Sequence, residues 1–182
     1  MRAPLTGRPW RDLSLTPLTC GPALRVLQEL DPQDRREAGC ALNGDASPDF
    51  LLREFLRRQG EGGHVFVAWS HRPEGGADPF AILGVAAIIA SGVGSAALLA
   101  RRHDRWRPQL RALAFALRVD LPPWARLQGF HRLEARSWSD HPTAGTLLGA
   151  IGFRHELRLV GFAAGGADFD LYALSTRPSP GA

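Results

Sequence analysis

The sequence predicts a single α/β domain built on a mixed β-sheet of about six to seven strands flanked by helices. The first observation is that stretches of strand and helix periodicity follow one another in the order β-α-α-α-β-β-β-α-β-α-β-β. The second is that 45% of the 182 residues are apolar, enough to bury a core. The third is that no repeat or linker divides the chain, so we expect one domain over residues 1–174 and a flexible, Pro/Gly/Ser-rich tail over 175–182.

Four elements are expected in the first third of the chain. Polar and apolar residues alternate over 12–18, which predicts a strand, and the leucines of 22–30 recur at helical spacing. A second helix is expected over 32–42, where most residues are polar. Ser47 followed by Pro48 is typical of a helix start, and the helix that follows has one apolar and one basic face.

The centre of the chain is predicted to form three strands, the first of them over 64–70. Residues 80–100 form an uncharged stretch of 21 residues, which is formally long enough to span a bilayer. Its middle, 91–95, reads Ser-Gly-Val-Gly-Ser, a composition typical of turns. We therefore expect two buried strands, 80–90 and 94–100, and no membrane partner.

The second half of the chain alternates again between helical and strand patterns. We expect helix 101–118, strand 130–138, helix 141–151, and strands 153–162 and 169–174. Pro122 and Pro123 should interrupt the first of these helices, because proline removes a backbone donor from a helix interior. Asp140 or His141 can cap the second helix at its N-terminus.

The charge and cysteine content set limits on partners and compartment. All 22 basic residues are arginine, which fits a coding bias, and the net charge of +4 is too modest to indicate a nucleic-acid partner. Cys20 and Cys40 match neither a disulfide framework nor a metal motif, so no metal is expected. The N-terminus has no apolar signal segment, so a cytoplasmic location is expected.

Residues 141–153, His-Pro-Thr-Ala-Gly-Thr-Leu-Leu-Gly-Ala-Ile-Gly-Phe, resemble a motif of the GNAT superfamily of N-acetyltransferases. That motif runs Asn, two residues, Ala, two residues, Leu-Tyr, three residues, Gly-Phe. Ala144, Leu147, Gly152 and Phe153 fall at the matching positions, and the flanking strands agree, so that about 45 residues are covered closely. The resemblance implies the GNAT fold and transfer of an acetyl group from acetyl-CoA to an unidentified amine.

The resemblance also implies a CoA site, and there the sequence departs from the family. Typical members carry Arg/Gln-x-x-Gly-x-Gly/Ala, whose backbone amides bind the pyrophosphate at a helix N-terminus. If Arg102 takes the first position, Arg105 and Arg107 replace the glycines, so either arginine side chains bind the phosphates or CoA does not bind. The backbone of Ala97, Leu98 and Leu99, on the preceding strand, would hold the pantetheine.

The catalytic positions of the family are altered as well. Where many members have a tyrosine that protonates the leaving thiolate, this chain has Leu148, and His141 replaces the Asn of the motif. His141 is a substitute acid or only a helix cap. Asp104 and His103 follow the strand that would bind CoA and are the best-placed candidates for a general base, a role that an ordered water also fills in some members.

A second, shorter resemblance concerns residues 30–37, Leu-Asp-Pro-Gln-Asp-Arg-Arg-Glu. They are similar to a segment of phage-encoded GNAT-like proteins in which an Asp-x-x-Glu pair lies on an early helix; otherwise the segment is a solvated helix face. Some such relatives are virion components. The sequence therefore leaves two main hypotheses: an N-acetyltransferase, or a catalytically degenerate binding or structural module with assembly or virion partners. Nucleic-acid binding through the five arginines of 101–111 is a third.

Overall fold

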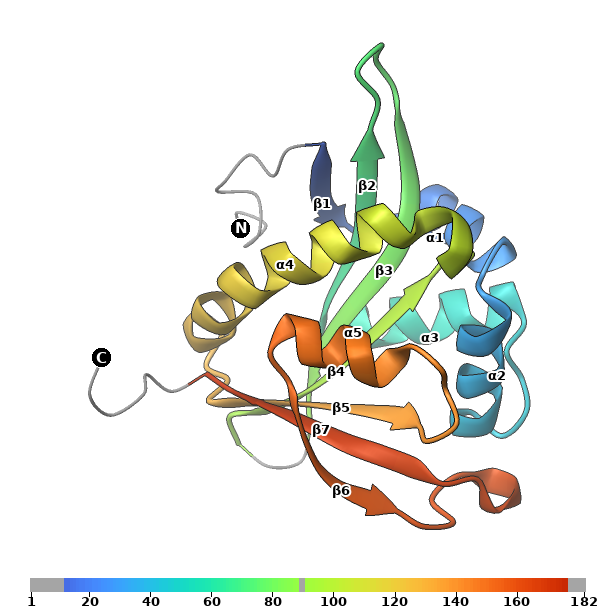
Figure 1. The fold of residues 1–182 in the computed structure, drawn as a ribbon, viewed down its shortest axis with the longest axis vertical. Helices are drawn as coiled ribbons and strands as arrows, with labels where there is room; N and C mark the ends of the chain where they lie inside the picture. The colour runs from blue at the N-terminus through green and yellow to red at the C-terminus, as the bar shows by residue number, and fades with distance from the viewer. Residues whose placement is uncertain (1–11, 89–90, 177–182) are drawn as a thin grey trace.

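The computed structural model describes residues 12–88 and 91–176, and within these ranges the chain forms one seven-stranded mixed sheet of order β1-β2-β3-β4-β5-β7-β6 (Figure 1). The strands are β1 (Leu13–Pro17), β2 (His64–His71), β3 (Ala77–Ala87), β4 (Val93–Ala100), β5 (Arg132–Trp138), β6 (Arg154–Leu159) and β7 (Phe169–Ser175). The helices are α1 (Cys20–Gln28), α2 (Pro32–Ala41), α3 (Pro48–Gly60), α4 (His103–Leu127) and α5 (Ala144–Ile151), with a 3₁₀ turn at Ala164–Gly166. The predicted fold class and element order are confirmed.

Helices cover both faces of the sheet, with α4 and α5 on one side and α1, α2 and α3 on the other (Figure 1). Because side chains alternate along a strand, Ala81 and Leu83 of β3 pack in the cluster with α4, while Ile82 packs with α1 and α3. The uncharged stretch 80–100 accordingly contributes to two strands, β3 up to Ala87 and β4 from Val93, as its turn residues predict; positions 89–90 of the expected first strand lie outside the described residues. Among the described residues, no helix has the length and apolarity needed to cross a membrane.

The sheet contains a gap between β4 and β5, and this gap positions the site described below. The two strands run parallel, and their pairing extends only from Val93↔Arg132 to Ala96↔Ala135. Beyond that point β4 continues to Ala100 and β5 to Trp138 without a shared ladder, and the strands diverge (Figure 1). Where β4 and β5 diverge, β4 stays paired with β3 on its other side, and β5 stays paired with β7.

The prediction that Pro122 and Pro123 interrupt a helix is wrong, because α4 runs through both prolines to Leu127. The prolines deprive two carbonyl groups one turn earlier of their backbone donors, and those residues are exposed to water, which can hydrogen-bond in their place. Leu121 and Trp124, on either side of the prolines, are 1% and 3% exposed. Burial of these side chains outweighs the lost hydrogen bonds.

The C-terminal end of the GNAT-like motif behaves as its sequence predicts. Gly152 caps α5 with φ +113°, a left-handed conformation that glycine adopts without steric cost, and Phe153 is buried. The domain also extends past the expected boundary at residue 174. Ser175 belongs to β7, and Thr176 is 2% exposed and donates from Oγ1 to the carbonyl of Phe130 at 2.7 Å. The rest of the expected tail, 177–182, lies outside the described residues.

Candidate functional site

Two cavities meet at the gap between β4 and β5. The first, which we call the α5-side cavity, has a volume of about 90 Å³ and is lined by β4, β5, α4 and α5, including Ala97, Leu98, Ser137 and Leu148. The second, the α3-side cavity, has a volume of about 250 Å³ and is lined by α2, α3 and the opposite face of the same strands. The residues that line both are Glu37, Ala96, Ala97, Leu99 and Arg136. The gap therefore connects the two faces of the sheet.

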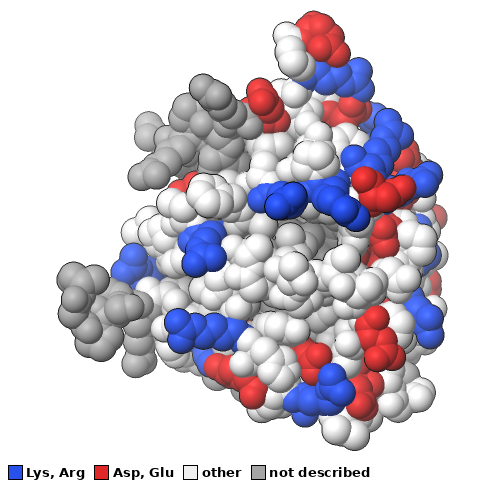
Figure 2. Space-filling model, viewed as in Figure 1, with Lys and Arg blue, Asp and Glu red and all other residues white. Residues whose placement is uncertain are grey.

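A larger groove of about 550 Å³ lies between α4 and α5. His103, Arg107 and Arg111 line it from successive turns of α4, while much of the rest of its lining is apolar, including Phe115 and Leu147. Figure 2 shows basic side chains along α4 above a hollow whose lower side carries no charge. The groove thus combines a cationic rim with an apolar wall.

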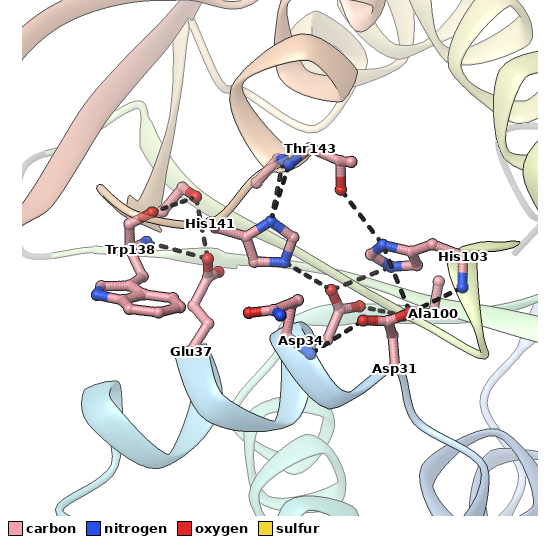
Figure 3. Close-up of polar contacts among 11 residues, drawn as sticks. Asp31, Asp34, Glu37, Ala100, His103, Trp138, His141 and Thr143 are labelled. Carbon is pink, nitrogen blue, oxygen red and sulfur yellow. Dashed lines mark hydrogen bonds and ion pairs between the residues drawn. The ribbon is translucent and has the colours of Figure 1, made fainter.

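Glu37 reaches from α2 to the diverging end of β5. Its Oε2 accepts hydrogen bonds from Ser137 Oγ at 2.9 Å and from the backbone N–H of Trp138 at 3.0 Å (Figure 3). Its Oε1 has no donor in the described part of the chain. Burial raises the pKa of Glu37, although the nearby His141 and these hydrogen bonds oppose that rise. A carboxylate with one anchored oxygen, one open oxygen and a raised pKa is suited to accept a proton.

Asp34 lies one turn before Glu37 on α2 and joins three other elements. Its Oδ2 accepts from the backbone N–H of Ala100 at 2.7 Å, and its Oδ1 lies 3.0 Å from His141 Nε2 (Figure 3). His103 Nε2 lies 3.1 Å from the same Oδ1, an ion-pair contact whose angle does not meet hydrogen-bond geometry. Burial raises the pKa of Asp34, but its contacts with His103 and His141 outweigh burial, so the net pKa is lowered.

His141 is held by both of its ring nitrogens. Nδ1 accepts from the backbone N–H groups of Thr143 at 3.3 Å and Ala144 at 3.1 Å, which caps α5 as the sequence suggests. Because Nδ1 is an acceptor, the ring proton is on Nε2, which donates to Asp34. The side chain is 2% exposed. His141 therefore fixes the start of α5 against α2.

His103 occupies the opposite side of Asp34, at the start of α4. Its Nδ1 lies 3.3 Å from Thr143 Oγ1 and 3.8 Å from Asp31 Oδ2. Burial lowers the pKa of the imidazole, but the Asp34 carboxylate outweighs burial, and the net pKa is raised. His103 also lines the groove between α4 and α5, so it presents a ring that favours the protonated state to that groove.

The backbone amides at the β4–α4 junction are occupied by carboxylates of the same chain. Asp31 Oδ2 accepts from His103 N at 2.8 Å, and Asp34 accepts from Ala100 N. The amide of His103 belongs to the segment where the GNAT resemblance expects a pyrophosphate, whereas that of Ala100 belongs to the end of β4. The carboxylate of Asp31 therefore occupies an amide at the N-terminus of α4, where an anionic ligand would bind.

The arginines expected in a phosphate loop point in different directions. Arg101 is buried and donates to the Pro79 carbonyl and to Glu29, while Arg102 is exposed and lies 3.6 Å from Asp104. The guanidinium of Arg105 lies 5.9 Å from the ring centre of Trp106. Of the expected phosphate-binding arginines, only Arg107 lines the α4–α5 groove, where Arg111 joins it.

Some of the site residues expected from the sequence lie at the β4–β5 gap, and others lie away from it. Ala97, Leu98 and Leu99 line the α5-side cavity, and His141 lies close to Glu37. Asp104 has a side chain that is 72% exposed and faces away from the gap. For Asp34 and Glu37, the only signal in the sequence is the Asp-x-x-Glu spacing. This three-residue spacing puts both side chains on one face of α2, and that face turns toward the sheet.

Asp34, His103 and His141 also form a group whose potential ligand atoms lie within 4.8 Å of one another. Two imidazoles and a carboxylate suit divalent transition metals. Coordination through Nε2 of His141 would, however, move its proton to Nδ1, toward the two backbone N–H groups that this atom accepts. The donor set thus fits a hydrogen-bonded cluster better than a metal centre.

A seven-stranded mixed sheet with a diverging parallel β4–β5 pair and helices on both faces is the fold of the GNAT N-acetyltransferases. The yncA protein from Salmonella typhimurium, with its cofactor acetyl-CoA, matches with a TM-score of 0.64 at 12% identity, covering 93% of this chain and 96% of that chain. The spermidine N-acetyltransferase from Vibrio cholerae in complex with CoA and spermine has a TM-score of 0.64 at 14% identity, with coverages of 91% and 96%.

A third similar structure is the ribosomal-protein-S5-alanine acetyltransferase from Vibrio fischeri, with a TM-score of 0.63, 13% identity, and coverages of 92% and 96%. In sequence, the chain matches no protein-family model and no curated protein. At these identities the likeness is one of fold, and the chemistry must be argued from the residues of the site.

Proposed function

We propose that the protein is an N-acyltransferase that transfers an acetyl group from acetyl-CoA to an amine. The observation that carries the proposal is the pair of cavities on opposite faces of the sheet that share Glu37 at the β4–β5 gap. A thioester can approach from one face and an amine from the other. The similar structures with acetyl-CoA, and with CoA and spermine, support a CoA thioester and an amine as the two substrates.

The donor occupies the α4–α5 groove and extends into the α5-side cavity. His103, Arg107 and Arg111 supply the cationic groups for its phosphates, in place of a glycine-rich loop. The N–H of Arg101 bonds to Phe80 of β3 and that of Ala100 faces Asp34, so strand alternation directs the N–H of Leu98 into the gap. This N–H polarises the thioester carbonyl.

In the reaction, Glu37 Oε1 accepts a proton from the amine as its nitrogen attacks the carbonyl carbon. The carbon–sulfur bond then breaks, giving the amide and the CoA thiolate. Leu148 lines the α5-side cavity and has no proton to give to the thiolate. His103 lines the α4–α5 groove and not the α5-side cavity, so the thiolate takes its proton from solvent, while His141 stays bonded to Asp34 and keeps α5 in position.

Calorimetry with acetyl-CoA, followed by an assay of free thiol release in the presence of mixed amines, tests the proposal. We expect binding in the micromolar to millimolar range and thiol release that depends on amine. No binding at millimolar acetyl-CoA would overturn the proposal. It would instead support the catalytically degenerate module, an alternative that the occupation of the first α4 amide, His103 N, by Asp31 favours.

A further inference from the structure

The α3-side cavity carries its own chemical specificity. Its walls are largely apolar, and they come from α2, α3, β7 and the segment before β7: Leu42, Leu51, Phe55, Phe162 and Phe169. At about 250 Å³ it lies just below the range of about 300–1,000 Å³ common for drug-sized ligands. The cavity thus suits a small molecule with an apolar body.

Two carboxylates line this cavity, and only one of them is open to a ligand. Glu54 is engaged by Arg57, whose Nη2 and Nε donate to it at 2.9 and 3.4 Å. Glu37 is anchored through Oε2 alone and leaves Oε1 open. The cavity therefore has one free carboxylate oxygen, at its inner end beside the β4–β5 gap.

Two guanidinium groups face the same cavity with unused donors. Arg136 lies 3.8 Å from Glu134, but Glu134 is bound more closely, at 2.9 Å, by Arg132. The guanidinium of Arg136 also lies over the ring of Phe162, 5.4 Å from the ring centre, and this contact fixes the direction of the Arg136 side chain. The side chain of Arg58 makes no ion pair or hydrogen bond within the described ranges 12–88 and 91–176, although its charge helps to lower the pKa of Glu54. The free cationic groups outnumber the free carboxylate.

The arrangement of these charges matches one class of molecule. Among the described residues, Glu37 and Arg136 are the charged residues that line both cavities, so both lie at the gap. An amine directed to Glu37 would leave an adjacent carboxylate facing Arg136, whose planar group can bind it with two hydrogen bonds. A polyamine would meet Arg136 and Arg58 with charges of the same sign.

We infer that the acceptor is an α-amino acid with an apolar side chain, an assignment that rests on the proposed acyl transfer. The amine is held at Glu37, the carboxylate at Arg136 with Arg58 at the entrance, and the side chain lies against the phenylalanines. Acetylation would remove the positive charge of the amine and leave the carboxylate as the anchor of the product.

Matched acceptors that differ only by the carboxylate test the inference. We compare L-leucine with 3-methylbutylamine, and L-phenylalanine with 2-phenylethylamine, in the thiol-release assay, with spermidine as a third class. The amino acids should have kcat/KM at least about ten-fold higher than their decarboxylated partners, because the carboxylate adds charge-assisted hydrogen bonds. Arg136→Gln should bring this ratio close to one, and Arg136→Lys should restore part of it.

Arg53→Gln, on the exposed side of α3, is the matched control and should leave the ratio unchanged. Equal or better use of the decarboxylated amines or spermidine, or an unchanged ratio in a folded Arg136→Gln protein, would overturn the inference.

Measuring acetyl-CoA binding in the same preparations distinguishes a failure of the proposed acyl transfer from a failure of the acceptor assignment. If acetyl-CoA binds and amines react without a carboxylate preference, acyl transfer stands and the acceptor assignment falls. If acetyl-CoA does not bind, calorimetry with L-leucine and 3-methylbutylamine still measures the preference, and equal binding overturns the assignment.

Discussion

At the scale of single residues, the site depends on what burial does to a carboxylate. Glu37 and Asp34 are one helical turn apart, yet the pKa of the first is raised and that of the second is lowered. The difference follows from their partners, since Asp34 contacts two imidazoles whereas Glu37 is bound by one hydroxyl and one backbone amide. One carboxylate is thereby suited to hold a structure together, and the other to take up a proton.

Glu37→Gln should lower kcat by about 10²- to 10⁴-fold, because the open oxygen can no longer accept a proton. The dissociation constant of acetyl-CoA should change little. In the wild type, kcat/KM should rise with pH through the raised pKa of Glu37, since the base acts only when ionised, and the variant should lack this rise. Glu61→Gln, exposed beyond the end of α3, serves as the control. A variant that retained full activity and the same pH profile would show that another base acts.

At the scale of elements, α2 holds the ends of three others through one side chain. Asp34 bonds to the end of β4, contacts the start of α4 and receives the ring that caps α5. α2 is itself fixed by Arg35, which donates to the carbonyls of Leu27 and Ala46 at 2.8 and 2.9 Å. The position of Glu37 is therefore set by the contacts of Asp34 as well as by its own.

Asp34→Ala should lower the free energy of unfolding by about 3–5 kcal/mol at pH 7, since it leaves a buried amide and two imidazoles without their partner. Chemical denaturation measures this, with Asp49→Ala in the exposed first turn of α3 expected to cost less than about 1 kcal/mol. If the two variants were equally stable, the Asp34 contacts would not be what holds α2.

The pH dependence of the Asp34→Ala effect has a defined sign. The lowered pKa of Asp34 means that its contribution to stability is present above its ordinary value near 3.9 and is lost as the pH falls through the lowered pKa. The raised pKa of His103 means that the ion-pair part is present below about 6.5 and is lost as the pH rises through the raised value. The difference between wild type and variant should therefore be largest in between.

At the scale of the whole molecule, the arginines of residues 101–111 differ in where they lie relative to the α4–α5 groove. Arg101 is used in packing, and Arg102 and Arg105 are outside the α4–α5 groove, whereas Arg107 and Arg111 line it. An anion bound in the groove would therefore be recognised by two arginines of α4 and not by the run of arginines that precedes it.

Arg107→Gln should raise the dissociation constant of acetyl-CoA by about ten-fold or more, the usual effect of losing one charge-assisted hydrogen bond. Arg105→Gln should have little effect, because its guanidinium lies over Trp106 outside the groove. Titration calorimetry at two salt concentrations distinguishes the variants. A larger loss in Arg105→Gln would mean that the phosphates bind at the helix N-terminus.

The fold could be predicted from the sequence to a greater extent than the site. Strand and helix periods are local, and Gly152 with Phe153 marks the end of α5 in any context. The continuation of α4 through Pro122 depends on the burial of Leu121 and Trp124, which no local pattern shows. Asp34 and Glu37 likewise read as a polar helix face until the packing of α2 against β4 and β5 is known.

The short pairing between β4 and β5 has a mechanical consequence. Since ladder pairing joins these strands only from Val93↔Arg132 to Ala96↔Ala135, the sheet consists of two stiffer halves, β1 to β4 and β5 to β7, with a seam between them. At the open end of the seam, the side chains of Asp34 and Glu37 bridge the two halves in place of a backbone ladder. The amide protons next to the seam should consequently exchange with solvent sooner than those of β3 at the centre of the first half.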